Sequence, residues 1–247
     1  MTTQTQTQTQ TEIETETEPE REAPSAVVAE PRRGSAVHRD AVWRLPTTVC
    51  RITDLLGPEV SGRILERAMD TASGAMNAST IRDGDVVPTF RRSRSDGTFT
   101  APELLIAIHE VLPSVEQALG VSCPDSEIAY GLNVHNDGDF YRTHQDVGSY
   151  DFASRRRLTF VYYLHRTPRP FEGGELRIYD GATAVRPGGR PLTWEDRTWA
   201  DHRPDHDSIL FFRPTTWHEA RAVRCPGGRP EDGRFAVNGW LTRRPPR

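Results

Sequence analysis

The sequence predicts a mainly β protein with flanking helices, in which antiparallel strands form a barrel or sandwich and helices pack outside one sheet. Two observations indicate this class. In the 247-residue chain, two stretches between residues 57 and 120 place apolar residues at helical spacing. After residue 126, short segments rich in β-branched and aromatic residues alternate with clusters of Gly, Asp, Asn and Pro, as strands alternate with turns.

The first 40 residues differ in composition from the rest of the chain. They begin as a Thr/Gln repeat, carry six Glu and one Arg over residues 12–22, and continue Pro-rich. Such a segment cannot bury enough apolar surface to offset its ordering entropy. We therefore expect a disordered acidic and polar tail at residues 1–40, followed by a single domain at 41–247 whose core spans about 126–243.

Two helices are expected before this core. Residues 57–72 and 100–120 both carry apolar side chains every three or four positions. In the second stretch, Thr100 and Glu103 have the spacing of a capping box, and Pro113 is expected to kink or divide the helix.

Short strands are expected throughout the core, and segments such as "ELRIYD" partly alternate in polarity, as half-buried strands do. The predicted strands are "SEIAYGLNVH", "DFYRTH", "RRLTFVYYLH", "GELRIYD", "DSILFFRP", "EARAV" and "RFAVNGWL".

Composition excludes several classes of protein. The three cysteines, Cys50, Cys123 and Cys225, are far apart and form no C-x-x-C pair, so we expect a reduced cytoplasmic protein without a structural zinc site. No apolar run is long enough to cross a membrane. The net charge of −4 lies mostly in the tail, and a near-neutral domain lacks the basic surface of a nucleic-acid binder. We therefore expect neither a membrane nor a nucleic acid as partner; the sequence leaves the oligomeric state open.

A histidine and an aspartate one residue apart stand out in "YRTHQDVGSY". Side chains two positions apart in an extended segment point to the same face, so His144 and Asp146 can converge on one point. With one more imidazole they would form the 2-His-1-carboxylate set that binds non-haem Fe(II). An H-x-D pair alone is also compatible with an ordinary surface turn.

We predict that His218 supplies the second imidazole. It lies between the apolar "SILFFRPTTW" and "EARAV", at the end of one predicted strand and the start of another, where a ligand can be held rigidly. His202 and His206 lie in the polar stretch "ADHRPDHD" and are expected to be solvated. His165, at the end of "RRLTFVYYLH", is the remaining candidate.

Arg234 is the candidate for an anion-binding group. It opens the strand "RFAVNGWL" and shares a face with Ala236, Asn238 and Trp240. An arginine that points into an apolar barrel is costly unless it meets an anion, and its planar fork suits a carboxylate. The alternative is an arginine at a strand end with its head in water. Three other arginines lie nearer to His218, and the last two belong to "RCPGGRPEDG", which is expected to be an exposed hairpin loop: Arg221, Arg224 and Arg229.

In this order, the motifs resemble the 2-oxoglutarate- and Fe(II)-dependent dioxygenases, most closely the prolyl 4-hydroxylase-like branch. "HNDGDFYRTHQD" is similar to the strand that precedes the metal site in that branch, "RRLTFVYYLH" followed by "FEGGELRIYD" to its sheet strand and Gly-Gly-Glu-Leu turn, and "RRSRSDGTF" to an upstream segment. The resemblance covers roughly residues 50–243. It departs from the branch at His135, where tyrosine is common, and in a longer spacing between His218 and Arg234.

The resemblance implies a double-stranded β-helix, a jelly-roll or cupin-like barrel, with the N-terminal helices packed on one sheet. It implies that His144, Asp146 and His218 bind Fe(II), that 2-oxoglutarate chelates this metal, and that Arg234 holds the far carboxylate of the co-substrate. Tyr163 either contacts the same carboxylate or is simply a barrel aromatic. The implied reaction uses O2 to hydroxylate an unactivated C–H bond and gives succinate and CO2, with ascorbate as reductant.

The implied substrate is a small molecule or peptide: a prolyl residue, a free amino acid or another amino-acid-derived metabolite. Arg91, Arg92 and Arg94 could bind a substrate carboxylate or a carrier phosphate, or could be solvated. Two other functions remain open. One is a cupin-like metal-binding module without turnover. The other is a nucleic-acid demethylase, which is disfavoured because Trp240 stands where that group has a second arginine.

Overall fold

The computed structural model describes residues 41–247 except 75, 82–83, 149–150, 185–191 and 245–247. The predicted tail at residues 1–40 therefore lies outside the described residues. The helical elements are α1 (Gly57–Ser73), α2 (Pro102–Leu119), α3 (Asp151–Ser154) and two short 3-10 turns at Trp194–Asp196 and Pro230–Asp232. The strands are β1 (Val42–Leu45), β2 (Cys50–Ile52), β3 (Asn77–Ala78), β4 (Arg91–Arg92), β5 (Arg94–Asp96), β6 (Ser126–His135), β7 (Phe140–His144), β8 (Arg156–Leu164), β9 (Glu172–Gly173), β10 (Leu176–Tyr179), β11 (Gly181–Ala184), β12 (Trp199–His202), β13 (Ser208–Phe212), β14 (His218–Ala220), β15 (Val223–Arg224) and β16 (Arg234–Arg243).

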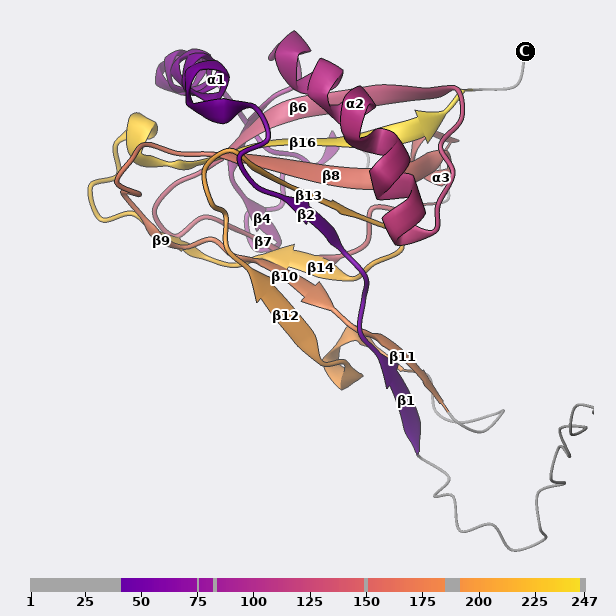
Figure 1. Cartoon of the computed structure of the whole chain (residues 1–247). Helices are drawn as coiled ribbons and strands as arrows, with labels where there is room; N and C mark the ends of the chain where they lie inside the picture. The colour runs from indigo at the N-terminus through magenta and orange to yellow at the C-terminus, as the bar shows by residue number, and fades with distance from the viewer. Residues whose placement is uncertain (1–40, 75, 82–83, 149–150, 185–191, 245–247) are drawn as a thin grey trace, which may run out of the picture. The chain divides into compact units, whose positions relative to one another are not determined.

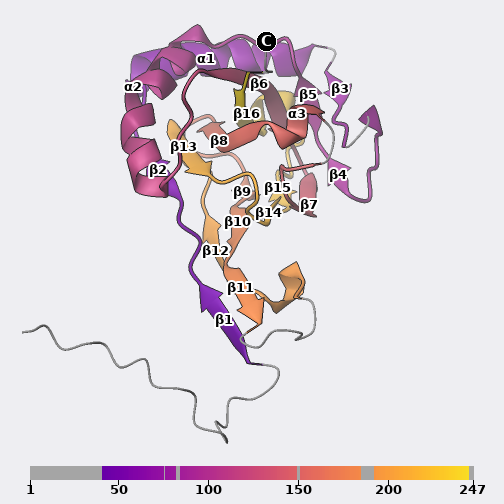
Figure 2. The same ribbon diagram turned by 90° about the vertical axis from the view of Figure 1, so that its right-hand side faces the viewer.

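Two antiparallel sheets form the body of residues 41–247. The larger sheet has the strand order β2-β13-β8-β16-β6-β5-β3, and the smaller has the order β12-β10-β14-β7-β4. Figures 1 and 2 show the two sheets facing each other, with α1 and α2 over the outer face of the larger sheet. This is the predicted arrangement: a double-stranded β-helix with N-terminal helices packed on one sheet.

Alternation along the central strands separates the helix-covered face from the inner face. On β8, Phe160 and Tyr162 join the core that includes both helices, whereas Val161 and Tyr163 belong to a second apolar cluster with β10 and β13. Side chains on successive strand residues point to opposite faces, so one strand contributes to both clusters. On β16 the same alternation places Arg234 and the other even-numbered residues of the strand on the inner face.

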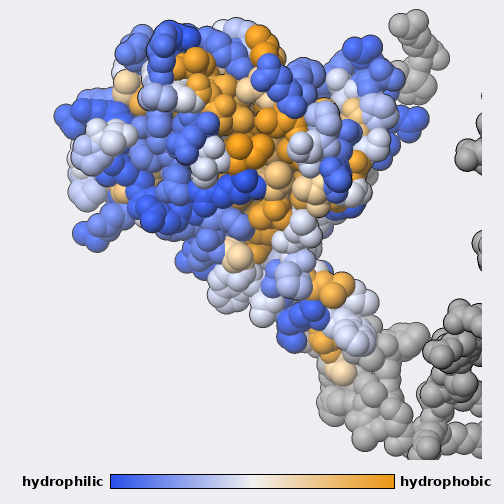
Figure 3. Space-filling view, in the orientation of Figure 1, coloured by the Kyte–Doolittle hydropathy of each residue, from blue (hydrophilic) through white to orange (hydrophobic). Residues whose placement is uncertain are grey.

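The helices bury their apolar stripes against the larger sheet. Ile64 of α1 and Leu104 and Ile108 of α2 are fully buried in this core. Partly buried side chains such as Leu112 also pack against this core. Figure 3 shows a band of apolar surface on the face that is turned to the viewer in Figure 1. None of the helices in the described ranges combines the length and the apolarity needed to cross a bilayer.

Two details of α2 differ from the prediction. The helix begins at Pro102 with Ala101 as its N-cap and no side-chain cap, so the predicted capping box of Thr100 and Glu103 does not form. Glu103 instead pairs with Arg67 of α1 at 2.9 Å. Pro113 lies inside the helix without dividing it.

The segment at residues 224–233 is more firmly held than the predicted exposed loop. β15 pairs with β9, and Cys225 and Asp232 are buried. The Asp232 carboxylate accepts hydrogen bonds from Arg166 at 2.8 Å and Arg229 at 2.6 Å. Only part of the prediction is right, since the side chains of Arg224 and Arg229 are exposed.

The start of α1 is stabilised by a carboxylate from a distant loop. Asp207, which is 3% exposed, accepts hydrogen bonds from the backbone N–H groups of Leu56 and Gly57 and from the hydroxyl of Tyr162. Its charge also complements the positive end of the helix dipole.

Replacing Asp207 by alanine should lower the free energy of unfolding by about 3 kcal/mol, because one buried and two partly buried donors lose their acceptor. The control is Asp205→Ala, which removes partly exposed ion pairs with Arg51 and Arg203 and should cost less than about 1 kcal/mol. Urea denaturation of both variants measures the difference. If the two variants lose the same free energy of unfolding, the cap formed by Asp207 does not stabilise the fold.

Candidate metal and co-substrate site

Three potential metal ligands converge between the two sheets. His144 ends β7, Asp146 follows two residues later, and His218 begins β14 directly opposite His144 in the antiparallel ladder. One ligand atom from each of the three lies within 4.8 Å of the others. The Nε2 atoms of His144 and His218 lie 3.8 Å and 3.7 Å from the Asp146 carboxylate. The structure thus brings together the three residues that the sequence singled out.

Hydrogen bonds to the backbone fix both imidazoles in the same tautomer. The Nδ1 atoms of His144 and His218 lie 2.7 Å and 2.9 Å from the carbonyl oxygens of Arg142 and Thr216. A carbonyl can only accept, so each Nδ1 carries the proton and each Nε2 presents its lone pair. Such partners behind a metal-binding histidine set its ring orientation.

Asp146 is also held from behind. Its Oδ2 accepts a hydrogen bond of 2.8 Å from Thr159, and its backbone N–H donates to the carbonyl of Pro214 at 2.9 Å. Burial and the neighbouring His218 lower the pKa of His144 to about 3, so this imidazole is neutral at physiological pH. Burial acts to raise the pKa of Asp146, but His218 and His144 hold it below its ordinary value. A neutral His144 imidazole beside an ionised Asp146 carboxylate is the pair of protonation states that a divalent metal needs.

Arg234 is buried on the inner face of β16. It is 2% exposed, and no carboxylate of the described residues pairs with it. Its Nε donates to the carbonyl of Gly174 at 2.8 Å, and its NH1 donates to Nδ1 of His135 at 3.4 Å. Gly174 has φ +71°, and a Cβ there would lie 2.7 Å from Cδ of Arg234. The Gly-Gly turn therefore makes room for the arginine.

Tyr163 lies beneath Arg234. The guanidinium carbon is 4.8 Å from the centre of the Tyr163 ring, and the buried hydroxyl has no hydrogen-bond partner among the described residues. Burial raises the pKa of Tyr163 even though Arg234 acts in the opposite direction, so the phenol is neutral.

His135 adds a further polar atom to the site. In the sequence it differed from the prolyl 4-hydroxylase-like branch, in which tyrosine is common at this position. It is 4% exposed, and its Nε2 has no partner in the described part of the protein. Burial, Arg234 and Arg91 hold the pKa of His135 well below 6.5. Because Nδ1 accepts from Arg234, the proton of this neutral ring is on Nε2.

Except for Tyr163, these groups line one pocket of about 550 Å³. Its walls come from β5, β6, β8 and β16 of the larger sheet and from β4, β7, β10 and β14 of the smaller one. The size is within the range of small-molecule sites. The metal-ligand candidates, Arg234 and His135 therefore share one cavity.

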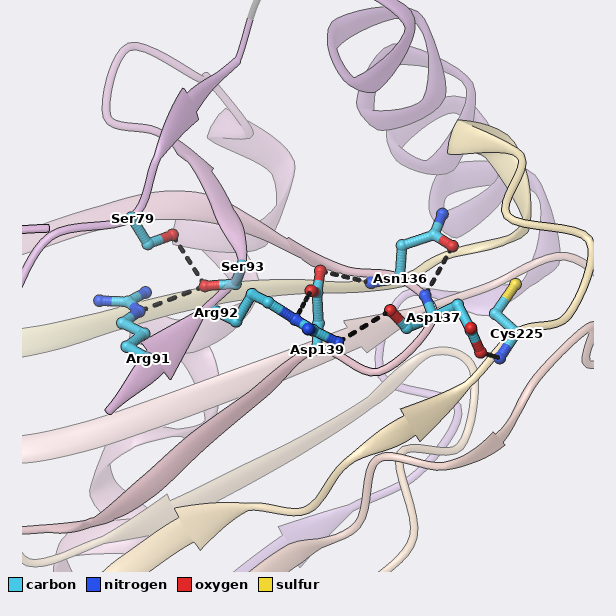
Figure 4. A network of polar contacts seen from close by, with 8 residues as sticks. All are labelled: Ser79, Arg91, Arg92, Ser93, Asn136, Asp137, Asp139 and Cys225. Carbon is cyan, nitrogen blue, oxygen red and sulfur yellow. Dashed lines mark hydrogen bonds and ion pairs between the residues drawn. The ribbon is translucent and has the colours of Figure 1, made fainter. Parts of the chain in front are cut away.

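The three arginines of "RRSRSDGTF" have different positions. Arg92 holds the turn between β6 and β7 through Asp139 at 3.0 Å (Figure 4), and Arg94 donates to the carbonyl of Ala72 at 3.0 Å. Arg91 alone lines the pocket. The three arginines lie on the two short strands β4 and β5.

The competing candidates lie elsewhere. His206 contacts Ser61 and the backbone of His165, and His202 ends β12; neither belongs to the cluster of potential ligands in the described ranges. Three arginines with exposed side chains form ion pairs with acidic residues: Arg221 with Glu219, Arg224 with Glu172, and Arg229 with the buried Asp232.

Two contacts of Asp146 were not predicted. Thr159 shares the inner face of β8 with Tyr163, so strand alternation from Tyr163 could have identified it. Arg156 donates to the backbone carbonyl of Asp146 and lies 3.7 Å over the ring of Trp240. No sequence signal distinguishes Arg156 from its arginine neighbours.

The fold and the donor set together define a class: a double-stranded β-helix with two histidines and a carboxylate on its inner face, as in non-haem Fe(II) oxygenases. Comparison with known proteins agrees. Residues 130–242 match the model of the 2OG-Fe(II) oxygenase superfamily. Over these residues the chain is similar to this superfamily.

A relative in Synechocystis sp., an uncharacterized PKHD-type hydroxylase, is 32% identical over 210 residues, which are 81% of this chain and 65% of the relative. The chain thus spans 65% of that relative's length. Among solved structures, a prolyl-4-hydroxylase of Pseudomonas putida has a TM-score of 0.56 at 22% identity, covering 80% of this chain and 94% of that one. A prolyl hydroxylase of Trichoplax adhaerens, solved with a hypoxia inducible factor peptide fragment, has a TM-score of 0.54 at 18% identity, covering 78% and 83%. These structures show the same fold.

Proposed function

We propose that the protein is a 2-oxoglutarate-dependent Fe(II) dioxygenase that hydroxylates an unactivated C–H bond of an amino-acid-derived substrate and releases succinate and CO2. The observation that carries the proposal is the donor set of His144, Asp146 and His218, with both Nε2 lone pairs directed to one point. Imidazole and carboxylate donors in this number suit Fe(II) and leave other metal positions for co-substrate and O2. When bound, Fe(II) and 2-oxoglutarate supply the oxidising chemistry.

In this proposal Arg234 binds the far carboxylate of 2-oxoglutarate. Burial lowers the pKa of Arg234, but a guanidinium remains charged, and a buried cation without a carboxylate partner needs an anion. His135 stands beside it in the pocket lining, and its Nε2 has no partner among the described residues. We propose that His135 donates a hydrogen bond to the co-substrate, and that Tyr163, which does not line the pocket, supports Arg234 from beneath.

The substrate is proposed to be a prolyl residue of a peptide, a free amino acid or a related metabolite, oxidised in the cytoplasm. The names of the relatives support a hydroxylase, and the pocket size suits a small molecule or one residue of a peptide.

Succinate formation tests the proposal. The purified protein is supplied with Fe(II), 2-oxoglutarate, ascorbate and air, and succinate is measured with and without iron. We expect iron-dependent succinate even without substrate, and inhibition when Zn²⁺ replaces Fe(II). Succinate at the same level in both samples would favour a metal-binding module without turnover.

Replacing His135 by phenylalanine should weaken 2-oxoglutarate binding about tenfold, because one hydrogen bond to a charged group is lost. His135→Gln should retain most of the affinity, since its amide can accept from Arg234 and donate into the pocket. Anaerobic titration of the Fe(II) protein with 2-oxoglutarate, followed by visible absorption, measures the dissociation constant. Unchanged affinity in His135→Phe would remove this residue from the co-substrate site.

A further inference from the structure

The Arg91 side chain lines the pocket, and no carboxylate forms an ion pair with it in the described part of the chain. Its Nε donates to Ser93 at 3.2 Å, its NH1 to the carbonyl of Thr80 at 2.9 Å, and its NH2 to the side-chain oxygen of Asn133. All three acceptors are neutral. Tyr141 is a further side-chain hydrogen-bond partner of this guanidinium, so of its five N–H groups one remains for a ligand.

The position of Arg91 is tied to the metal site through one aromatic ring. Its guanidinium carbon lies 4.5 Å from the centre of the Tyr141 ring, and that ring stacks on His144 with centres 3.7 Å apart. The negative charge of Asp146 is near enough to raise the pKa of Arg91, although burial lowers it overall. A group held by Arg91 is therefore only a short distance from any metal at His144.

The side chain of Arg91 is pre-positioned. Figure 4 shows its bond to Ser93, which in turn donates to Ser79 at 2.8 Å in a buried contact. β4 itself pairs with β7, where Arg91 faces Tyr141 across the ladder. A cation fixed by its neighbours loses little entropy when it binds an anion.

The charges of the pocket favour a negatively charged substrate. Among its lining residues, arginine occurs at positions 91, 156 and 234, whereas the acidic residues are Asp96 and Asp146. The charges of Fe(II) and of the 2-oxoglutarate dianion cancel, so the pocket keeps an excess of positive charge after both bind. Asp96 accepts hydrogen bonds from the backbone and hydroxyl of Thr98 and does not pair with Arg91.

We propose that Arg91 binds a free carboxylate of the primary substrate, which makes the substrate a small carboxylic acid, such as a free amino acid, in preference to an internal residue of a peptide. This inference rests on the proposed dioxygenase function and assigns its substrate class. A charge-assisted hydrogen bond from a guanidinium N–H to a carboxylate is shorter and stronger than one between neutral groups.

The test compares matched substrates. A panel of free L-amino acids, proline included, is supplied next to the corresponding carboxamides and to a blocked prolyl peptide. Stimulation of 2-oxoglutarate consumption and a mass gain of one oxygen are measured for each compound. Free acids should stimulate turnover, and their carboxamides and the blocked peptide should not.

Variants identify the residue responsible. Arg91→Gln should lower kcat/KM for the responsive acid roughly thirtyfold or more, a loss much larger than any accompanying change in the KM for 2-oxoglutarate. Arg91→Lys should recover part of the loss. Arg92→Gln removes the same charge one residue further along the strand, outside the pocket lining, and should retain wild-type kcat/KM.

Three results would overturn the assignment: a carboxamide or blocked peptide as good as the free acid, wild-type kcat/KM in Arg91→Gln, or no response of an active enzyme to any free acid. Absence of iron-dependent succinate formation in the wild type would instead overturn the proposed function itself. The two failures are therefore distinguishable.

Discussion

Replacing His218 by alanine should abolish iron-dependent succinate formation, with a loss of at least about a thousandfold. The residue offers one of only two imidazole donors in the cluster, and a site with one histidine and one carboxylate holds Fe(II) weakly. His144→Ala and Asp146→Ala should have the same effect. Succinate formation and Fe(II) affinity are measured for each variant, with circular dichroism as the check on folding.

His206→Ala is the control for these variants. This histidine contacts Ser61 and the backbone of His165, outside the pocket, so its loss should leave iron binding unchanged. An active His218→Ala protein together with an inactive His206→Ala protein would contradict the assignment of the ligands.

Arg234→Ala should raise the KM for 2-oxoglutarate a hundredfold or more while iron affinity changes little. The lost contact is between a buried charge and the co-substrate, and breaking such a pair costs on the order of 3–5 kcal/mol. Arg234→Lys should recover part of the affinity, because lysine keeps the charge but loses the planar fork.

Arg224→Ala supplies the matched control, since its exposed guanidinium lies 3.5 Å from the exposed carboxylate of Glu172. Its KM for 2-oxoglutarate should equal that of the wild type. If instead Arg224→Ala raises the KM and Arg234→Ala does not, the carboxylate site lies on β15 and not on β16.

Local patterns predicted much of the fold and the cluster. Alternation along β16 placed Arg234 on the same face as Asn238 and Trp240, and all three line the pocket. The H-x-D spacing predicted that His144 and Asp146 lie close together, because side chains two positions apart in an extended chain point to the same face. His218 followed from its place between two apolar segments.

Features that depend on distant parts of the chain could not be predicted. The start of α1 is capped by Asp207, which belongs to a loop far along the sequence, and no local motif at Leu56 reports it. Likewise, "RRSRSDGTF" offers three arginines, and only the pairing of β4 with β7 decides that Arg91 faces the pocket. The burial of Cys225 depends on the turn at Asp137, whose carboxylate accepts its N–H at 2.8 Å.

The cross-strand pairing of His144 with His218 also couples the site to the folded state. In an unfolded chain these histidines are far apart, so a metal ion has no comparable set of donors there and binds the native state preferentially. By thermodynamic linkage, an ion present at a hundred times its dissociation constant stabilises the fold by about 2.7 kcal/mol. A redox-inert metal ion that fills the site should therefore raise the melting temperature. This shift measures the occupancy of the site without oxygen or any substrate.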